Sequence, residues 1–458
     1  LQIIEQLIET DPLDFRIRNE YYLALKESDK IDESERVLES LSLEMRDFDE
    51  NYVDLAVGYI NDGLLKEAED VLIRFQGDNP IFDYYLGYIA DKNGENTIAQ
   101  KYFNSAAGKS VDFIFPHRLE TIYVLNKALE YNPNDGKAYY YLGNILYEKQ
   151  PEVAIEHWKS SVEMNPDLAV SYRNIGMGYY QHYDDIQNAI LYYEKAIELT
   201  KDEAIYYTEL DDLYELNNSP IEKRLNLFQG QNDVVKERDD SFIRQIGVLT
   251  MAGQPEKAVE YLDGVEFVYR EGSSRVRETV IDAQLMLGRN FFKNREYDKA
   301  LKHYLEAQIP EEEAGSSRLG DRNMQVNYFI GTAYEALGDK ETATEFYKRS
   351  AGRNSGTLNV MNFYQGLSFE KLGKRTEANN IYEYMIKEAD IQLNSEYSDL
   401  GVKFGGREAS SVRESRYHTI RGLANKGLNN GIQANKSLNK AVELSHSNIW
   451  ANAELENM

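Results

Sequence analysis

The sequence predicts an all-α fold in which pairs of antiparallel helices stack side by side. Three observations support this prediction: a recurring glycine–alanine spacing, a large apolar residue at a fixed distance after each alanine, and few prolines. Five glycines are each followed twelve residues later by an alanine; the pairs are Gly87/Ala99, Gly288/Ala300, Gly331/Ala343, Gly366/Ala378 and Gly422/Ala434. A pattern that recurs about every 34 residues is typical of stacked helical hairpins.

The residues that follow each alanine extend the pattern. A large apolar side chain stands four residues later; these residues are Phe103, Tyr304, Tyr347, Tyr382 and Leu438. Residues four apart share one face of a helix. We therefore expect the small residues to let the two helices of a pair approach closely, and the large ones to fill the seam between neighbouring pairs.

The best-formed pair runs from Gly136 to Pro166. Gly143 stands where its first helix crosses the second, and Trp158 is the large residue of the second helix. Pro166 ends the pair because proline cannot continue a helix. The next pair keeps the pattern with Gly176 and Ala189, at a spacing of thirteen residues.

Other segments depart from the pattern. Residues 111–133 keep only a second-type helix, and residues 203–230 have Asp211 and Lys223 at the two small positions. Long interruptions stand near 308–323 and 390–415, and loops of that length are usually functional or disordered. We therefore expect partly degenerate repeats in 1–133, well-formed repeats in 134–230, and repeats with long loops in 231–458.

These three regions are expected to form one continuous array. The 458 residues include only nine prolines and no long linker rich in Gly, Ser and Pro. Each unit of such an array buries its apolar face against its neighbours alone, so the array can exceed the size of one compact domain.

The net charge of −27 restricts the classes of partner. Binding to nucleic acid requires Lys and Arg to neutralise phosphates, so we expect no nucleic-acid partner. An anionic membrane surface is disfavoured for the same reason, and no apolar run is long enough to insert into a membrane. A basic or neutral protein partner is compatible with this charge.

The sequence offers no legible catalytic or metal site. It has no cysteine, which excludes disulfides and thiolate chemistry, and its six histidines show no metal-ligand spacing. We expect no enzyme activity, no cofactor and no metal. Absence of cysteine favours the cytoplasm, with a bacterial periplasm as the alternative. Because Leu1 is not a methionine, we expect further residues before it.

The recurring residues resemble the tetratricopeptide repeat, whose pattern is W-x2-L-G-x2-Y, then A-x3-F-x2-A, then P. Leu142-Gly143, Ala154, Trp158 and Pro166 carry the resemblance most fully, and about ten units can be placed along the chain. The resemblance implies a right-handed superhelical solenoid that is a non-catalytic scaffold for protein–protein interaction through its concave groove.

A narrower resemblance joins three stretches to one bacterial family. These stretches are residues 112–120 (DFIFPHRLE), Glu209–Tyr214 and the segment GDRNMQVNYFIGTAYEALGD. In that family a mutarotase-like β-sandwich domain of unknown function precedes a tetratricopeptide array. This implies an alternative: an accessory region of a carbohydrate-binding or carbohydrate-active protein, with its own N-terminal domain or a sugar as ligand.

The resemblance also implies which residues face the groove. The predicted partner-binding residues are Tyr84, Tyr88, Tyr140, Asn144, Tyr147, Arg173, Met177, Tyr180 and Tyr328. Tyrosine offers a rigid apolar ring with a polar tip, which suits recognition of a peptide or a sugar. The oligomeric state and the partner's identity stay open at this stage.

Two local features are predicted to be structural. Asp211, Asp212 and Glu215 are read as a solvated acidic helix, because no partner for them is identifiable in the sequence. His117-Arg118 is read as the start of a helix, with Arg118 paired to a neighbouring carboxylate.

Overall fold

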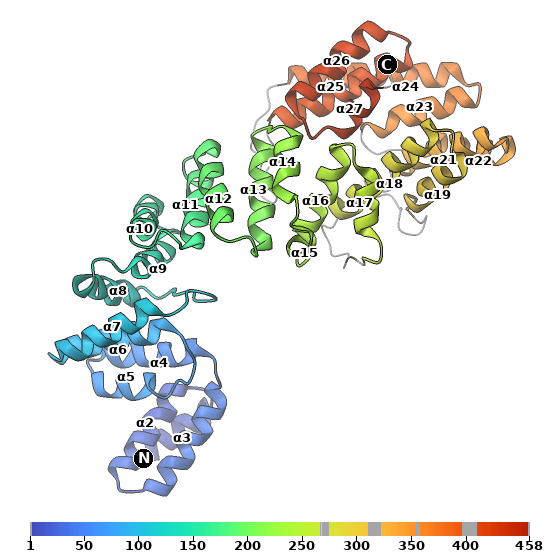
Figure 1. The fold of residues 1–458 in the computed structure, drawn as a ribbon. Helices are drawn as coiled ribbons and strands as arrows, with labels where there is room; N and C mark the ends of the chain where they lie inside the picture. Colours follow the sequence, from blue (N-terminus) through green and yellow to red (C-terminus); the bar gives the residue numbers. More distant parts are fainter. Residues whose placement is uncertain are drawn as a thin grey trace. The chain divides into compact units, whose positions relative to one another are not determined.

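The computed structural model describes residues 2–265, 267, 274–309, 322–353, 358–395 and 410–456, and every regular element within them is an α-helix (Figure 1). The all-α prediction is confirmed. The chain divides into two compact units, Leu1–Asp184 and Asp185–Met458. This division falls inside the stretch 134–230, which the sequence predicted as one region.

The N-terminal unit holds eleven of the helices that the structure describes. They are α1 (Gln2–Thr10), α2 (Phe15–Glu27), α3 (Ile31–Met45), α4 (Asp49–Asn61), α5 (Leu65–Leu72), α6 (Pro80–Lys92), α7 (Asn96–Gly108), α8 (Glu120–Tyr131), α9 (Gly136–Leu146), α10 (Pro151–Met164) and α11 (Ala169–Gln181). Consecutive helices pair as α2 with α3, α4 with α5, α6 with α7, and α9 with α10. Helices α1, α8 and α11 stand outside these four pairs, and for α8 this agrees with the predicted loss of a first helix in residues 111–133.

The C-terminal unit begins at α12. Its described helices are α12 (Ile186–Leu199), α13 (Ala204–Leu216), α14 (Ile221–Phe228), α15 (Asn232–Val235), α16 (Asp239–Met251), α17 (Pro255–Leu262), α18 (Ser274–Lys293), α19 (Tyr297–Glu306), α21 (Arg322–Leu337), α22 (Lys340–Gly352), α23 (Met361–Lys371), α24 (Arg375–Asn394), α25 (Ser410–Gly427), α26 (Gly431–Leu444) and α27 (Ile449–Leu455).

Described helices overlap both predicted long interruptions, and the middle of each lies outside the described residues. The first, near 308–323, ends where α21 begins at Arg322, and 310–321 lie outside the described residues. The second, near 390–415, begins and ends in helix, because α24 runs to Asn394 and α25 starts at Ser410. Residues 396–409 lie outside the described part of the chain.

The small–large pattern acts as a close-packing device within each pair. A Cβ atom placed on Gly143 would lie 2.3 Å from Trp158 Nε1, and one placed on Gly366 would lie 2.3 Å from Tyr382 Cε1. Both distances are far below a normal contact, so the large residue of the second helix occupies the space that a side chain would need.

The same large residues also fill the seam between neighbouring pairs, as predicted. Tyr382 approaches Gly427 of α25 so closely that a Cβ there would lie 2.5 Å from its ring. A core of buried residues consequently runs through the C-terminal unit from Ile281 in α18 to Ala451 in α27.

Candidate functional site

Most of the predicted groove residues of the N-terminal unit lie on or directly after two neighbouring helices, α9 and α11, and the other two lie on α6. Asn174 Nδ2 donates to Asn144 Oδ1 at 3.0 Å, which joins the two helices. Trp158 Nε1 donates to the same oxygen, also at 3.0 Å. Two donors therefore fix the orientation of the Asn144 amide, and with it the face that α9 and α11 share.

Half-buried side chains of mixed chemistry flank this amide pair. The Tyr147 hydroxyl donates to Gln181 Oε1 at 3.2 Å. Arg173 Nη1 donates to Asn174 Oδ1 at 3.2 Å and lies 3.8 Å from the Met177 sulfur. We name as the α9–α11 surface the residues Asn144, Tyr147, Arg173, Met177 and Tyr180, all of which are half-buried.

Two of the predicted groove tyrosines are core residues. Tyr84 is fully buried and its hydroxyl donates to Asp135 Oδ2 at 2.8 Å. Tyr140 is 4% exposed, and burial raises the pKa of its hydroxyl. Neither side chain offers surface to a partner. Tyr88, on α6, is half-buried, with the Lys92 ammonium 5.1 Å from its ring centroid.

The last predicted residue, Tyr328, lies in the C-terminal unit between two cavities. One cavity of about 530 Å³ is lined by Tyr328 together with Arg289, Tyr304 and Glu335. The other, of about 400 Å³, is lined by Tyr328 together with Tyr364, Lys426 and Glu454, among other residues. Tyr328 is half-buried, so it contributes ring surface to both cavities.

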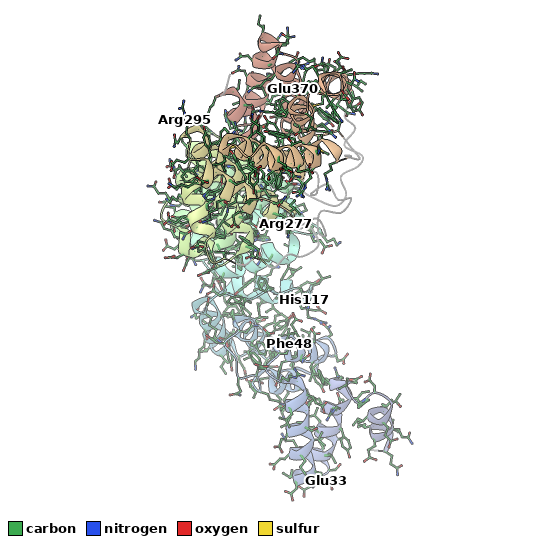
Figure 2. The ribbon with its side chains drawn as sticks, turned by 90° about the vertical axis from the view of Figure 1, so that its right-hand side faces the viewer. Glu33, Phe48, His117, Arg277, Arg295 and Glu370 are labelled. Carbon is green, nitrogen blue, oxygen red and sulfur yellow. The ribbon has the colours of Figure 1, made fainter. Side chains whose placement is uncertain are left out.

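The segment before α8 exposes apolar side chains that sequence reasoning did not select. Phe113 is 90% exposed and Phe115 is 72% exposed. Exposed aromatic residues in one loop mark candidate interaction surfaces. Arg118 forms an ion pair with Asp54, which confirms its predicted pairing with a carboxylate. His117 Nδ1 lies 3.8 Å from Glu50 Oε1. Figure 2 labels His117 on the N-terminal unit.

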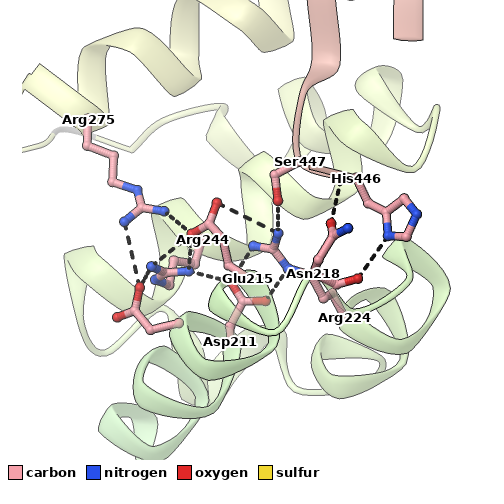
Figure 3. Close-up of polar contacts among 9 residues, drawn as sticks. Asp211, Glu215, Asn218, Arg224, Arg244, Arg275, His446 and Ser447 are labelled. Carbon is pink, nitrogen blue, oxygen red and sulfur yellow. Dashed lines mark hydrogen bonds and ion pairs between the residues drawn. The ribbon is translucent and has the colours of Figure 1, made fainter. Parts of the chain in front are cut away.

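The predicted solvated acidic helix is wrong for Asp211, which has no exposed surface. Arg224 donates to both of its carboxylate oxygens, from Nε at 2.7 Å and from Nη2 at 2.8 Å. Arg244 Nη1 donates to Oδ2 at 2.6 Å (Figure 3). The sequence contained an indication of this cluster. Arg224 follows Asp211 by thirteen residues, the same spacing as between Gly176 and Ala189, so the two charged residues occupy the paired small positions of a repeat.

The cluster continues outward from Asp211. Arg275 Nη2 lies 2.9 Å from Glu215 Oε2, and Arg244 also pairs with Asp212 (Figure 3). Burial alone would raise the pKa of Asp211, but Arg224 and Arg244 hold it below its ordinary value. Burial lowers the pKa of Arg244 to about 10, so it stays charged at neutral pH. Asp211 and its two arginines therefore form a buried ion network that joins α13, α14 and α16.

Within the described residues, no group of three or more His, Asp and Glu side chains is arranged to hold a metal ion. Nor does any described helix combine the length and the apolar character that crossing a membrane requires.

Comparison with known proteins agrees with the repeat pattern. Residues 325–356 match the family model described as Tetratricopeptide repeat. This match spans α21 and α22, including Gly331, Ala343 and Tyr347.

Three solved structures are similar over part of the chain. Pseudomonas aeruginosa pilF is 17% identical over 46% of this chain and 87% of its own, with a TM-score of 0.26. MamA of Desulfovibrio magneticus RS-1 is 20% identical over 43% and 99%, with a TM-score of 0.25. YrrB, described as a TPR protein with an unusual peptide-binding site, is 19% identical over 44% and 95%, with a TM-score of 0.20.

The matched pair α21–α22 shares its tight glycine crossing with other pairs: a Cβ on Gly331 would lie 2.6 Å from Tyr347, and one on Gly87 would lie 2.6 Å from Phe103. Residues 325–356 therefore match a tetratricopeptide repeat, and other helix pairs of the chain share its glycine crossing.

Proposed function

We propose that the chain is a non-catalytic scaffold that binds a protein or peptide partner through the α9–α11 surface. The observation that carries this proposal is the amide pair of Asn144 and Asn174, 3.0 Å apart. It joins two neighbouring helices, and Tyr147 and Arg173, which stand three residues after Asn144 and one residue before Asn174, are both half-buried. A preorganised face loses little conformational entropy when a partner binds.

The chemistry of the surface favours one kind of segment. Tyr147 and Tyr180 provide ring faces for apolar side chains, and Arg173 provides a cation in a chain of net charge −27. Aromatic residues and arginine are the side chains that most often dominate binding energy at interfaces. We infer that the partner presents an apolar side chain close to a carboxylate.

The test starts by capturing a partner from a cell lysate and then measures its affinity with purified proteins. The variant Tyr147→Ala, Arg173→Ala, Tyr180→Ala should weaken binding by at least about tenfold, because interface residues of these types typically contribute more than 1 kcal/mol each. The matched control is Tyr123→Ala with Tyr384→Ala, since both tyrosines are more than half exposed and lie outside the surface.

Two further variants decide between the alternatives. If the triple variant binds as tightly as the native chain and keeps its helical content, the α9–α11 surface is not the site. Loss of binding with Phe113→Ser and Phe115→Ser would then place the partner on the loop before α8. A glycan screen tests the sugar-linked alternative, in which no protein partner is captured and a saccharide binds instead.

A further inference from the structure

The last helix of the C-terminal unit contacts helices far from it in sequence. Trp450 of α27 donates from Nε1 to Asp282 Oδ1 of α18 at 2.9 Å. Its ring centroid lies 6.2 Å from that of Phe329 in α21 and 6.1 Å from that of Tyr364 in α23. In a repeat array each unit normally contacts only its neighbours. Helix α27 packs against its neighbours α25 and α26, and it also touches the first helices of three earlier pairs.

Two cations converge on the other end of α27. Glu454 Oε1 lies 3.0 Å from Arg289 Nη1, and its Oε2 lies 2.9 Å from Lys426 Nζ. Arg289 also donates from Nη2 to the Ala453 carbonyl oxygen at 3.1 Å, and its guanidinium lies 5.5 Å from the Trp450 ring centroid. Trp450 and Glu454 are 6% and 7% exposed.

These contacts define a recognition pattern. Trp450 and Glu454 are four residues apart, so they project from one face of the helix. The facing surface offers an aromatic slot formed by Phe329 and Tyr364 beside a pair of cations, Arg289 and Lys426. A short amphipathic helix that lays such a face into a groove is a recurrent mode of peptide recognition. We name this surface the α27 groove.

Three pockets that open to solvent border helix α27 or the α27 groove. The cavities of about 530 and 400 Å³ beside Tyr328 border the α27 groove at Arg289 and at Glu454. A third pocket, of about 680 Å³, is lined by Asn452 and Ala453 of α27 and by Met286 and Asn290 of α18. These pockets are open to solvent, so a competing side chain can reach the edges of α27, although Trp450 and Ala451 are buried.

The segment before α27 is held by separate contacts. The backbone N–H of His446 donates to Asn218 Oδ1 at 2.7 Å, and Arg224 Nη1 donates to Ser447 Oγ at 2.5 Å (Figure 3). None of these contacts involves α27 itself. The helix can therefore leave its groove while the tether stays attached, which keeps its effective concentration near the groove high.

We propose that α27 is an intramolecular ligand of the α27 groove, and that a partner protein displaces it. The partner presents a helix that carries an aromatic residue and, four residues later, a carboxylate. The proposal concerns the C-terminal unit alone and does not depend on the α9–α11 surface, so each can fail without the other.

The first experiment supplies the helix in trans. A fluorescein-labelled peptide of residues 445–456 (SHSNIWANAELE) is titrated, by anisotropy, into the full chain and into a chain that ends at Leu444. The shortened chain should bind at least about tenfold more tightly, because the tethered helix no longer competes. Peptides with Trp450→Ala or Glu454→Lys should lose that binding, while a peptide with Asn452→Gln, which keeps both key residues, should retain it.

Two results of this experiment would overturn the proposal. One is a shortened chain that keeps its helical circular dichroism but binds the peptide no more tightly than the full chain. The other is a full chain that forms a dimer by exchanging α27, since a second copy would then be the occupant. Loss of helical content in the shortened chain would assign α27 a structural role and equally overturn it.

The second experiment keeps the full chain intact. The protein has two tryptophans, so Trp158→Phe leaves Trp450 as the only one. A competing peptide with phenylalanine at the position of Trp450, at about 1–10 mM, should raise acrylamide quenching of Trp450 severalfold without changing helical content, since short tethers give millimolar effective concentrations. Adding Glu454→Lys to the full chain should lower the peptide concentration needed, because it weakens the tethered helix and leaves the competing peptide and the groove unchanged. Unchanged quenching in both cases would overturn the proposal.

Discussion

Two buried aspartates show how differently the two units of this chain handle charge in their interiors. Asp135 of the N-terminal unit is 3% exposed and accepts hydrogen bonds from the backbone N–H groups of Lys137 and Ala138 and from the Tyr84 hydroxyl. Asp211 of the C-terminal unit is fully buried and accepts from two arginines. The first is a helix cap, and the second is the centre of an ion network.

The difference appears in the direction of the pKa shift. Burial raises the pKa of Asp135, even though its hydrogen bonds and Lys137 act against the shift. Burial acts on Asp211 too, but Arg224 and Arg244 outweigh it and lower the pKa. A buried carboxylate can thus be satisfied by neutral donors or by cations. Only the second solution makes the fold depend on the negative charge.

The sharpest test of this comparison is the same substitution in both units. Asp211→Asn removes the charge between two buried arginines and should destabilise the C-terminal unit by about 3–5 kcal/mol, the usual cost of breaking a buried ion pair. Asp135→Asn keeps an acceptor for the backbone N–H groups and should cost about 1 kcal/mol, in the range of a lost hydrogen bond.

Each unit carries its own reporter for this measurement. Trp158 lies in the N-terminal unit and Trp450 in the C-terminal unit, and both are buried. Denaturant unfolding followed by fluorescence in the Trp450→Phe and Trp158→Phe backgrounds therefore reads the two units separately. Equal losses of unfolding free energy for the two substitutions would show that the two arginines do not make the fold more dependent on the charge of Asp211 than on that of Asp135.

The next largest effect should come from the glycine crossings. Gly143→Ala in the N-terminal unit places a Cβ 2.3 Å from Trp158 and should cost about 1–3 kcal/mol, as overpacking does. Gly247→Ala in the C-terminal unit is the matched control, because its nearest neighbour, the Thr279 Cγ2 atom, would be 3.6 Å away. The control should be neutral or stabilising by about 0.5–1 kcal/mol, since alanine favours helix. Thermal unfolding that ranks the two variants in the opposite order would contradict this.

The contrast between these glycines also shows what the sequence could reveal. The small–large spacing predicted the crossing of Gly143 with Trp158 because both partners stand within one repeat. The same reasoning misread Asp211, because one of its partners, Arg244, stands 33 residues later in another pair. Tyr84 was placed in the groove by its position in the repeat, yet its hydroxyl meets Asp135, 51 residues away. Local patterns predict contacts within a repeat, whereas polar contacts between repeats depend on how the repeats stack.

Asp135 and Asp211 should contribute to the pH dependence of stability in opposite directions. The raised pKa of Asp135 gives stability that is fully present below its unfolded value of about 3.9 and is lost as the pH rises through the folded value. The lowered pKa of Asp211 gives stability that is present above about 3.9 and is lost as the pH falls through the folded value.

Unfolding curves at pH 7, 4 and 3 test this prediction with the two tryptophan reporters. Asp211→Asn should reduce the acid sensitivity of the C-terminal unit, whereas Asp135→Asn should increase that of the N-terminal unit. The comparison of each variant with its own parent cancels the titration of all other carboxylates. Parallel changes in both variants would refute the opposite signs.

The smallest effects should come from ion pairs on the surfaces, where the two units ought to behave alike. Lys159 Nζ lies 2.8 Å from Glu156 in the N-terminal unit, and Lys440 Nζ lies 2.6 Å from Glu443 in the C-terminal unit. Each pair spans one helical turn in contact with water. Lys159→Gln and Lys440→Gln should each change the free energy of unfolding by less than about 0.5 kcal/mol, and less still in high salt. A large loss of unfolding free energy for Lys440→Gln alone would mean that charge stabilises the surface of the C-terminal unit as well as the Asp211 network. The difference between Asp135 and Asp211 would then reflect a difference between the whole units.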